Sequence, residues 1–320
     1  MIERKFNSKI PFDKIRLHSS ERNKEWDTLF ELFKISLTDS DIRYYPNLDT
    51  IYNKCRKFFD CKNLILGSGS DRCIKYFLEC NQKYNKVIST DPSFPMYKIY
   101  SQMLNYKYVG VKYKTLDFPE KEFLSSITKD SIVVLSNPNT PIAHNLTLDL
   151  IKKILDKNVP TLIDEAYIEF AGIPSCKHLL ENFSNLYVTR TFSKALGSAG
   201  VRAGVLLSNK DNIKNALQYR DMYELTGLTI KWIEVIINNY HHVENYINSV
   251  LDTKKNIEKV LKKKNISYIN SYSNWLHIKE PFKVPEDILV KSGCTLPGSN
   301  STWTRMSICS SVSFDWLNKL

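Results

Sequence analysis

Residues 186–207 read LYVTRTFSKALGSAGVRAGVLL, and this stretch decides the fold that the sequence predicts. Apolar runs at 186–188 and 205–207 are each short enough to be a buried strand. Between the two runs lie hydroxyl side chains, Lys194 and a series of small residues that leads to Arg202. Polar residues that follow an apolar strand so closely are typical of the ligand-binding edge of a parallel sheet.

The same alternation of short apolar runs and helical patterns extends over residues 60–210. Candidate buried strands lie at 64–66, 86–89, 132–135, 161–163, 186–188 and 205–207. Between them, residues 73–78 and 148–155 carry apolar side chains at helical spacing. Strands that alternate with helices predict an α/β domain, in which helices cover both faces of a mostly parallel central sheet.

The C-terminal part of the chain has a different pattern. Residues 228–263 carry apolar side chains at helical spacing, and shorter strand-like runs follow at 266–269 and 275–278. A smaller α+β domain packed beside the large sheet accounts for this change. We therefore expect an N-terminal segment (1–40) that joins the small domain, a large domain (41–224) and a small C-terminal domain (225–320).

The composition is that of a globular protein, with 42% hydrophobic and 25% charged residues in a chain of 320. No window approaches the roughly 18 uninterrupted apolar residues of a membrane-spanning helix. The first residues lack the apolar core of a secretory signal. The seven cysteines are scattered, without Cys-x-x-Cys pairs or zinc spacing. We therefore expect reduced thiols in the cytoplasm, no membrane contact and no metal site.

The net charge of +11 invites a nucleic-acid hypothesis, because clustered lysines neutralise phosphates. The lysines are spread along the chain, however, and the one dense run, residues 262–264, ends a helical pattern. A basic run in that place is typical of a solvated helix end. The charge favours the attraction of a small anionic substrate instead, and we expect no nucleic-acid partner.

Polar or glycine-rich segments directly follow several of the predicted strands. They occupy residues 67–71, 91–94, 137–141, 164–167 and 189–194. Because the carboxyl ends of parallel strands meet at one edge of a sheet, these segments are expected to line one crevice. Taken alone, the residues also have a simpler interpretation: Ser70 and Asp71 are typical helix caps, and so is Asp164 at a strand end.

Two features favour a bound ligand over simple caps. The glycine-rich approach to Ser70 frees backbone N–H groups at a helix start for an anion. The hydroxyls before Lys194, together with Arg202 after it, are the groups that a phosphate monoester requires. A lysine amine that is desolvated near them becomes nucleophilic toward an aldehyde. In such a site, Asp164 would stay ionised beside a pyridinium nitrogen.

The segment 191–204, in which Ser-Lys precedes a run of small residues and Arg-x-Gly, resembles the signature of the class I/II aminotransferases of fold type I. It is most similar to the branch that contains histidinol-phosphate aminotransferase and threonine-phosphate decarboxylase. The other polar segments stand in the order of that family, so the resemblance covers residues 41–320. It implies pyridoxal 5′-phosphate as the cofactor.

The resemblance also implies a role for each matching residue. Lys194 joins the cofactor as a Schiff base and moves the proton between the substrate Cα and the cofactor. Asp164 pairs with the pyridinium nitrogen, and Tyr167 donates to the phenolic oxygen. Thr140 stands where the family carries an asparagine as a second donor to that oxygen. The residues implied to hold the phosphate or to stack on the ring are Ser70, Asp71, Phe94, Thr191, Ser193 and Arg202.

Two further residues are implied to act from outside this set. Tyr45 matches a tyrosine that reaches the phosphate from the partner subunit, so the resemblance implies a homodimer with active sites at its interface. Arg305 matches the C-terminal arginine that binds the substrate carboxylate through two hydrogen bonds. Tyr223 is a further candidate to approach the substrate.

The sequence departs from the family pattern around the substrate. Arg72 stands where an acidic residue is usual, and the usual Asn-Glu-Asn-Pro reads Ser-Glu-Arg-Asn at 20–23. Lys291 replaces a second substrate-binding arginine. We therefore expect Arg22, Arg72, Lys291 and Arg305 as candidate cations of the pocket, and a small anionic acceptor, phosphorylated or not.

Three functions remain open at this point. The first is an aminotransferase that moves an amino group from glutamate to a small anionic keto or aldehyde acceptor. The second is a decarboxylase of the phosphoserine or phosphothreonine type, since the cofactor stabilises the carbanion from either bond cleavage. The third is a non-catalytic, partner-binding relative on the same fold. The first is our working hypothesis.

Overall fold

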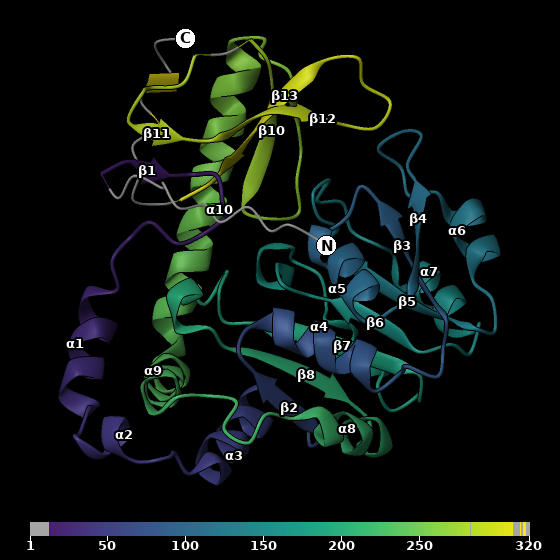
Figure 1. Ribbon diagram of the computed structural model, residues 1–320. Coiled ribbons are helices and arrows are strands. Elements are labelled where there is room, and N and C mark those ends of the chain that lie inside the picture. Colours follow the sequence, from purple (N-terminus) through teal and green to yellow (C-terminus); the bar gives the residue numbers. More distant parts are fainter. Residues whose placement is uncertain (1–12, 282, 310–313, 315, 318–320) are drawn as a thin grey trace.

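A seven-stranded sheet forms the centre of the large domain in the computed structural model, which describes residues 13–281, 283–309, 314, 316 and 317 (Figure 1). Its strands are β2 (Leu64–Gly67), β3 (Lys86–Asp91), β4 (Lys107–Lys112), β5 (Ser131–Ser136), β6 (Thr161–Asp164), β7 (Leu186–Thr191) and β8 (Gly204–Ser208). Their order across the sheet is β2-β8-β7-β6-β5-β3-β4. Strand β8 runs opposite to the other six strands, which share one direction. The predicted α/β domain with a mostly parallel sheet is therefore confirmed.

Helices cover both faces of this sheet because its inner strands are apolar on both sides. Along β5, Ile132 and Val134 belong to one hydrophobic core, whereas Val133 and Leu135 belong to the other. The first core includes helices α4 (Ser70–Glu79), α5 (Pro95–Met103) and α8 (Lys210–Ala216). The second includes α3 (Leu48–Phe58), α6 (Glu120–Ser126) and α7 (Leu148–Leu155).

All six strands that the sequence predicted in the large domain are present, but the prediction missed β4. This strand lies at the edge of the sheet, beyond β3, and its sequence KYVGVK begins and ends with lysine. Its side chains are partly or fully exposed. An edge strand needs no continuous apolar run, and for that reason its sequence does not stand out.

The small domain combines a long helix with an antiparallel sheet. Residues predicted as helical, 228–263, form α9 (Gly227–Asn238) and α10 (Tyr240–Lys263), and Figure 1 shows α10 alongside the small sheet. That sheet has the order β12 (Lys291–Thr295), β13 (Thr302–Ser307), β10 (Trp275–Lys279) and β9 (Tyr268–Ile269). The sequence predicted β9 and β10 but neither β12 nor β13, which are short of consecutive apolar residues.

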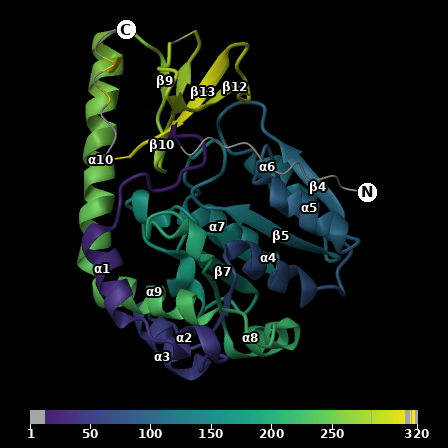
Figure 2. The ribbon, with the colours of Figure 1, turned by 60° about the vertical axis from the view of Figure 1, so that its left-hand side comes forward.

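The N-terminal segment contacts both halves of the molecule. Strand β1 (Ile15–Arg16) pairs with β11 (Ile288–Leu289) of the small domain, and the Ser307 amide donates to the Leu17 carbonyl. Helices α1 (Asp27–Ser36) and α2 (Ser40–Arg43) lie instead beside α9 and α3, as Figure 2 shows. Residues between β1 and α1 therefore cross from the small domain to the large one.

Short 3-10 helices complete the chain. They are η1 (Ile168–Phe170), η2 (Cys176–Leu179), η3 (Ala199–Val201) and η4 (Leu217–Tyr219). Within the described residues, every helix is too short or too polar to cross a membrane.

Candidate active site

The polar segments that follow the strands meet at one edge of the large sheet and enclose a cavity of about 310 Å³. The cavity is closed on its other side by residues of the N-terminal segment, Ser19 and Glu21. Ten of the residues singled out in the sequence line it: Ser70, Asp71, Phe94, Thr140, Asp164, Tyr167, Thr191, Ser193, Lys194 and Arg202. The expected crevice at the carboxyl ends of the strands is therefore present.

Lys194 is carried by the turn that follows β7, and its amine points into the cavity region. Its Nζ donates to the Ser19 carbonyl over 2.9 Å. The same nitrogen lies 5.4 Å from the centre of the Tyr167 ring. Small residues directly after the lysine let this turn fold back on itself, because the Gly197 amide bonds the Lys194 carbonyl at 2.9 Å with Gly197 at a φ of +57°.

Asp164 ends β6 and is only 4% exposed. Its Oδ1 accepts from the Ala166 amide at 3.1 Å, and its Oδ2 accepts from the Tyr97 hydroxyl at 2.7 Å. Burial raises the pKa of Asp164 to about 6, although both of these hydrogen bonds oppose the rise. The carboxylate caps no helix, since the next helical turn begins only at Ile168. The helix-cap interpretation of Asp164 is therefore wrong.

The first turn of α4 forms an anion-binding cradle. Gly69 precedes the helix with a φ of +83°, and no side chain caps the first amides. A Cβ on Gly69 would overlap the Arg202 guanidinium, and one on Gly204 would overlap the Gly69–Ser70 backbone. These two glycines thus bring Arg202 close to the helix start, where amide N–H groups and the helix dipole favour a phosphate.

Arg202 itself is held in an unusual backbone conformation. Its φ is +56°, in the left-handed region that a residue other than glycine enters only at a cost of about 1–3 kcal/mol. Its guanidinium donates to Asp71 Oδ2 at 3.1 Å and to Ser193 Oγ at 3.4 Å. The carboxylate of Asp71 thus binds a guanidinium and caps no main-chain amide, so the cap interpretation does not hold for it either.

These groups fit pyridoxal 5′-phosphate by their chemistry. A buried carboxylate, Asp164, and the cradle of amides, hydroxyls and Arg202 line one cavity. Lys194 and the aromatic ring of Phe94 line the same space. A phosphate, a basic ring nitrogen and an aldehyde are the three features that this set of residues complements.

The sequence reasoning missed several residues that line the cavity. Tyr97 and Ser136 come from the large domain, whereas Ser19 and Glu21 come from the N-terminal segment. Tyr97 could have been found, because it follows Phe94 by three residues at the start of a helix that begins at Pro95. Glu21 belongs to the segment 20–23 that departs from the family pattern around the substrate, but no local signal marks Ser19, whose place depends on the pairing of β1 with β11.

The proposed pocket cations Arg22, Arg72 and Lys291 lie outside the cavity lining. Arg72 donates to Glu79 at 2.7 Å and to Asp221 at 3.0 Å, and it does not line the cavity. Arg22 lies 3.4 Å from the Trp26 ring centre and 4.1 Å from that of Tyr246.

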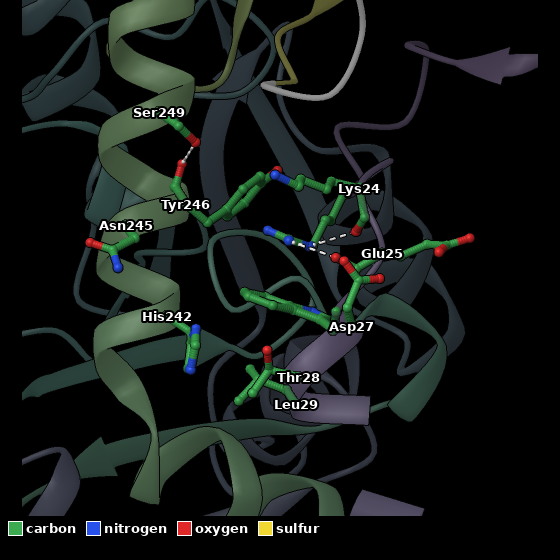
Figure 3. Close-up of a pocket in the computed structure, with 11 residues that line it drawn as sticks. Lys24, Glu25, Asp27, Thr28, Leu29, His242, Asn245, Tyr246 and Ser249 are labelled. Carbon is green, nitrogen blue, oxygen red and sulfur yellow. Dashed lines mark hydrogen bonds between the residues drawn. The ribbon is translucent and has the colours of Figure 1, made fainter. Parts of the chain in front are cut away.

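Arg22 belongs to a separate hollow of about 280 Å³ between the N-terminal segment and α10, where Figure 3 shows Tyr246 facing Lys24. Its guanidinium donates to the carbonyls of Lys24 and Glu25. Lys291, on the strand next to Arg305, is exposed and also lies outside the cavity lining.

Arg305 and Tyr45 stay predictions, because neither lines the cavity of the single chain. Arg305 donates to the His18 carbonyl at 3.0 Å, and Lys194 binds the carbonyl of the next residue, Ser19. Tyr45 is 79% exposed and stacks on Tyr223, with 4.2 Å between ring centres.

Comparison with known proteins agrees with this geometry. Residues 39–306 match the family model for aminotransferase class I and II, and the chain belongs to that family. It is a pyridoxal-phosphate-dependent aminotransferase, and the predicted cofactor is confirmed.

Several curated relatives of the chain are named histidinol-phosphate aminotransferase. A histidinol-phosphate aminotransferase of Brachyspira hyodysenteriae is 29% identical over 265 residues, which are 78% of this chain and 73% of the relative. Another, of Christiangramia forsetii, is 34% identical over 204 residues, 62% of this chain and 58% of the relative. The predicted resemblance to this branch is confirmed, and it argues against a non-catalytic relative.

Solved structures show the same fold at low sequence identity. Histidinol-phosphate aminotransferase from Sinorhizobium meliloti, in complex with pyridoxal-5′-phosphate, has a TM-score of 0.82 at 15% identity, covering 95% of this chain and 89% of that one. L-threonine-O-3-phosphate decarboxylase from Porphyromonas gingivalis has a TM-score of 0.76 at 16% identity, covering 95% and 96%. These likenesses confirm the predicted fold type and do not separate the two reactions.

Proposed function

We propose that the protein transfers an amino group between glutamate and a small phosphorylated keto or aldehyde acceptor, in the manner of the histidinol-phosphate aminotransferases that it resembles. The observation that carries this proposal is the convergence of Lys194, Asp164 and the Arg202 cradle on one cavity. The net charge of +11 supports an anionic substrate.

The cofactor, when bound, supplies an electron sink for the carbanion at the substrate Cα. The chain's own residues have separate roles in this proposal. Lys194 holds the cofactor covalently and moves the proton at Cα as a general base and acid. Asp164 stays ionised to pair with a protonated ring nitrogen. Tyr167 and Thr140 donate hydrogen bonds to the oxygen beside the reacting carbon.

The phosphate end is assigned to residues with no part in proton transfer. Ser70 and Asp71 offer backbone amides of the first turn of α4, and Thr191 and Ser193 offer hydroxyls. Arg202 offers a guanidinium. Phe94 is proposed to stack on one face of the ring. Arg305 is proposed to bind the substrate carboxylate after releasing the His18 carbonyl that it now holds.

A homodimer is part of the proposal, with Tyr45 reaching the phosphate of the partner. An apolar surface supports it, on α1, α2, the start of α9 and the loops beside them. Its exposed members are Phe30, Leu32, Ile35, Ile42, Tyr44, Tyr45, Met222, Tyr223 and Leu228. Figure 2 shows these helices gathered at one end of the molecule. Exposed apolar side chains on neighbouring helices are typical of an association site.

We also propose that the protein works in the cytoplasm. Its buried cysteines Cys55, Cys73 and Cys176 carry thiols and form no disulfide. Reduced thiols in a protein with several cysteines are typical of a reducing compartment.

The function is tested with the purified holoenzyme in three steps. Reduction with borohydride should bleach the visible cofactor absorbance and place the added mass on Lys194. In a separate, unreduced sample, incubation with glutamate alone should convert the cofactor to its amine form, and addition of the keto analogue of histidinol phosphate should restore the aldehyde form. Carbon dioxide release from phosphoserine or phosphothreonine, without that conversion, would contradict the transfer reaction and favour the decarboxylase.

A further inference from the structure

Tyr97 occupies a special place in the cavity, since it contacts both the acidic and the aromatic part of the site. Its hydroxyl donates to Asp164 Oδ2 over 2.7 Å, and its ring meets the Phe94 ring edge-on, with centres 5.5 Å apart at 82°. We propose that Tyr97 is a positioning residue that keeps Asp164 ionised and oriented for the cofactor ring. This inference rests on the role proposed above for Asp164.

The local sequence explains how one residue reaches both groups. Phe94 immediately precedes α5 and Pro95 is its first residue, so Phe94 and Tyr97 are three positions apart and lie on one side of the first turn. This turn sits just past the end of β3, whereas Asp164 ends β6. The two strands flank β5, and the Tyr97 hydroxyl therefore spans the end of β5 to reach the carboxylate.

The hydroxyl matters because the surroundings of Asp164 disfavour its charge. Burial is the largest cause of its raised pKa, and the charges of Asp71 and Glu165 raise it further. Only the hydrogen bonds from Tyr97 and from the Ala166 amide act in the opposite direction among these causes. The titratable groups around the carboxylate are Asp71 and Cys73 of α4, Tyr97 of α5, the adjacent Glu165, and Tyr167 and Lys194 across the cavity.

Tyr97 itself remains a donor throughout the accessible pH range. Its side chain is 0% exposed, and burial together with the nearby Asp164 charge raises its pKa well above the ordinary value. A phenol that cannot ionise has to give its proton to an acceptor, since a buried hydroxyl without a partner is costly. The acceptor here is a carboxylate that lines the cavity, which a purely structural tyrosine does not need.

Tyr106 provides a matched control. It belongs to the same hydrophobic core as Tyr97, is 5% exposed, and donates over the same distance, 2.7 Å, but to the Leu78 carbonyl. Tyr106 does not line the cavity. Tyr106→Phe removes an equivalent buried hydrogen bond without touching Asp164, whereas Tyr97→Phe removes the one that Asp164 accepts.

The test is a fluorescence titration of the cofactor-free protein with pyridoxal 5′-phosphate between pH 5 and 9. Binding through ionised Asp164 is present above its pKa and is lost as the pH falls through it. Tyr97→Phe should raise that pKa, so the loss should begin about 1–2 pH units higher, and affinity near neutral pH should fall roughly 10- to 100-fold. Tyr106→Phe should keep both the affinity and the pH profile of the wild type.

The outcomes separate this inference from the proposed function. Asp164→Asn should weaken binding near neutral pH and remove the part of the pH dependence that is caused by this carboxylate. If Asp164→Asn weakens binding while Tyr97→Phe keeps the wild-type profile, the role of Tyr97 is wrong and that of Asp164 stands. If Asp164→Asn binds like the wild type, the role proposed for Asp164 is itself wrong.

A second measurement decides the matter if Tyr97→Phe does not fold. Carboxyl ¹³C NMR of the cofactor-free wild type, with the Asp164 signal assigned by its absence in Asp164→Asn, gives the pKa of that group directly. A pKa near the value of about 6 supports the donation from Tyr97. A pKa of about 7 or higher overturns it, because that is the range expected for the carboxylate without the hydrogen bond from the tyrosine.

Discussion

Two walls of the active-site cavity are built in different ways. We call the residues on the strand-end segments of the large sheet, such as Asp164, Lys194 and Arg202, the cofactor wall. Ser19 and Glu21 of the N-terminal segment form the second wall, which we call the substrate wall, and Arg305 lies outside the lining, bound to the His18 carbonyl. Ten residues of the cofactor wall were predicted from sequence, whereas the substrate wall was marked only by the departure from the family pattern at residues 20–23.

The difference follows from how the residues are placed. Most residues of the cofactor wall follow a buried parallel strand within a few residues, so strand order brings them to the common edge, and Arg202 lies just before β8, the antiparallel strand that begins at that edge. The substrate wall depends on the pairing of β1 with β11 and of Ser20 with Ser307, positions 287 residues apart. The cofactor wall is therefore fixed by the fold, and the substrate wall is free to change with the substrate.

The largest effect that would test this comparison is expected at Lys194. Lys194→Ala should lower turnover by at least about 10⁴-fold, because both the covalent link and the proton transfer are lost. Steady-state assays with glutamate measure this loss. Lys152→Ala, on the exposed face of α7, is the control and should leave turnover unchanged. Substantial activity in Lys194→Ala would contradict the assignment of the cofactor wall.

Arg202 should come next. Arg202→Ala should weaken binding of pyridoxal 5′-phosphate roughly 10- to 100-fold, since a charged hydrogen-bond donor to the phosphate is removed. Arg202→Lys should restore only part of the affinity, because an ammonium cannot reproduce the planar fork. Pyridoxal, which lacks the phosphate, should bind both variants and the wild type equally. An equal loss for pyridoxal would mean that Arg202 acts on the fold and not on the phosphate.

A change next to the substrate wall should separate substrate from cofactor. Arg305→Lys should raise the KM for glutamate about 10-fold by removing a two-bond contact with its carboxylate, while cofactor affinity stays at the wild-type value. Steady-state assays give the KM for glutamate, and cofactor titration gives the cofactor affinity. A shift in cofactor affinity without a change in KM would assign Arg305 to the cofactor instead.

The smallest effect is expected at Tyr45. Tyr45→Phe should weaken cofactor binding only a few-fold, through one hydrogen bond from the partner subunit. Light scattering should show that the variant is still a dimer, and cofactor titration of that dimer should show the weaker binding. Tyr223→Phe keeps the stack with Tyr45 and serves as the control. A monomeric protein with full cofactor affinity would contradict the role of Tyr45 and the proposed dimer together.

The sequence predicted much of the large domain and less of the small one. The inner strands β5, β6 and β7 are apolar on both faces, and their runs stand out. The edge strand β4 and the exposed strand β12 carry polar residues and were missed. Arg72 was misassigned because a sequence does not reveal that Glu79 and Asp221 neutralise it.

By itself, the sequence determined six of the seven strands of the large sheet, because each is a short apolar run. Through the resemblance of residues 191–204 and the other polar segments to a known family, it also gave the cofactor and ten residues that line the cavity. Tertiary structure decided which groups face one another across long distances in the chain. Among these are the bond from Tyr97 to Asp164 and the contacts of Lys194 and Arg305 with the N-terminal segment. Such contacts follow from the packing of whole elements, and no local pattern of residues encodes them.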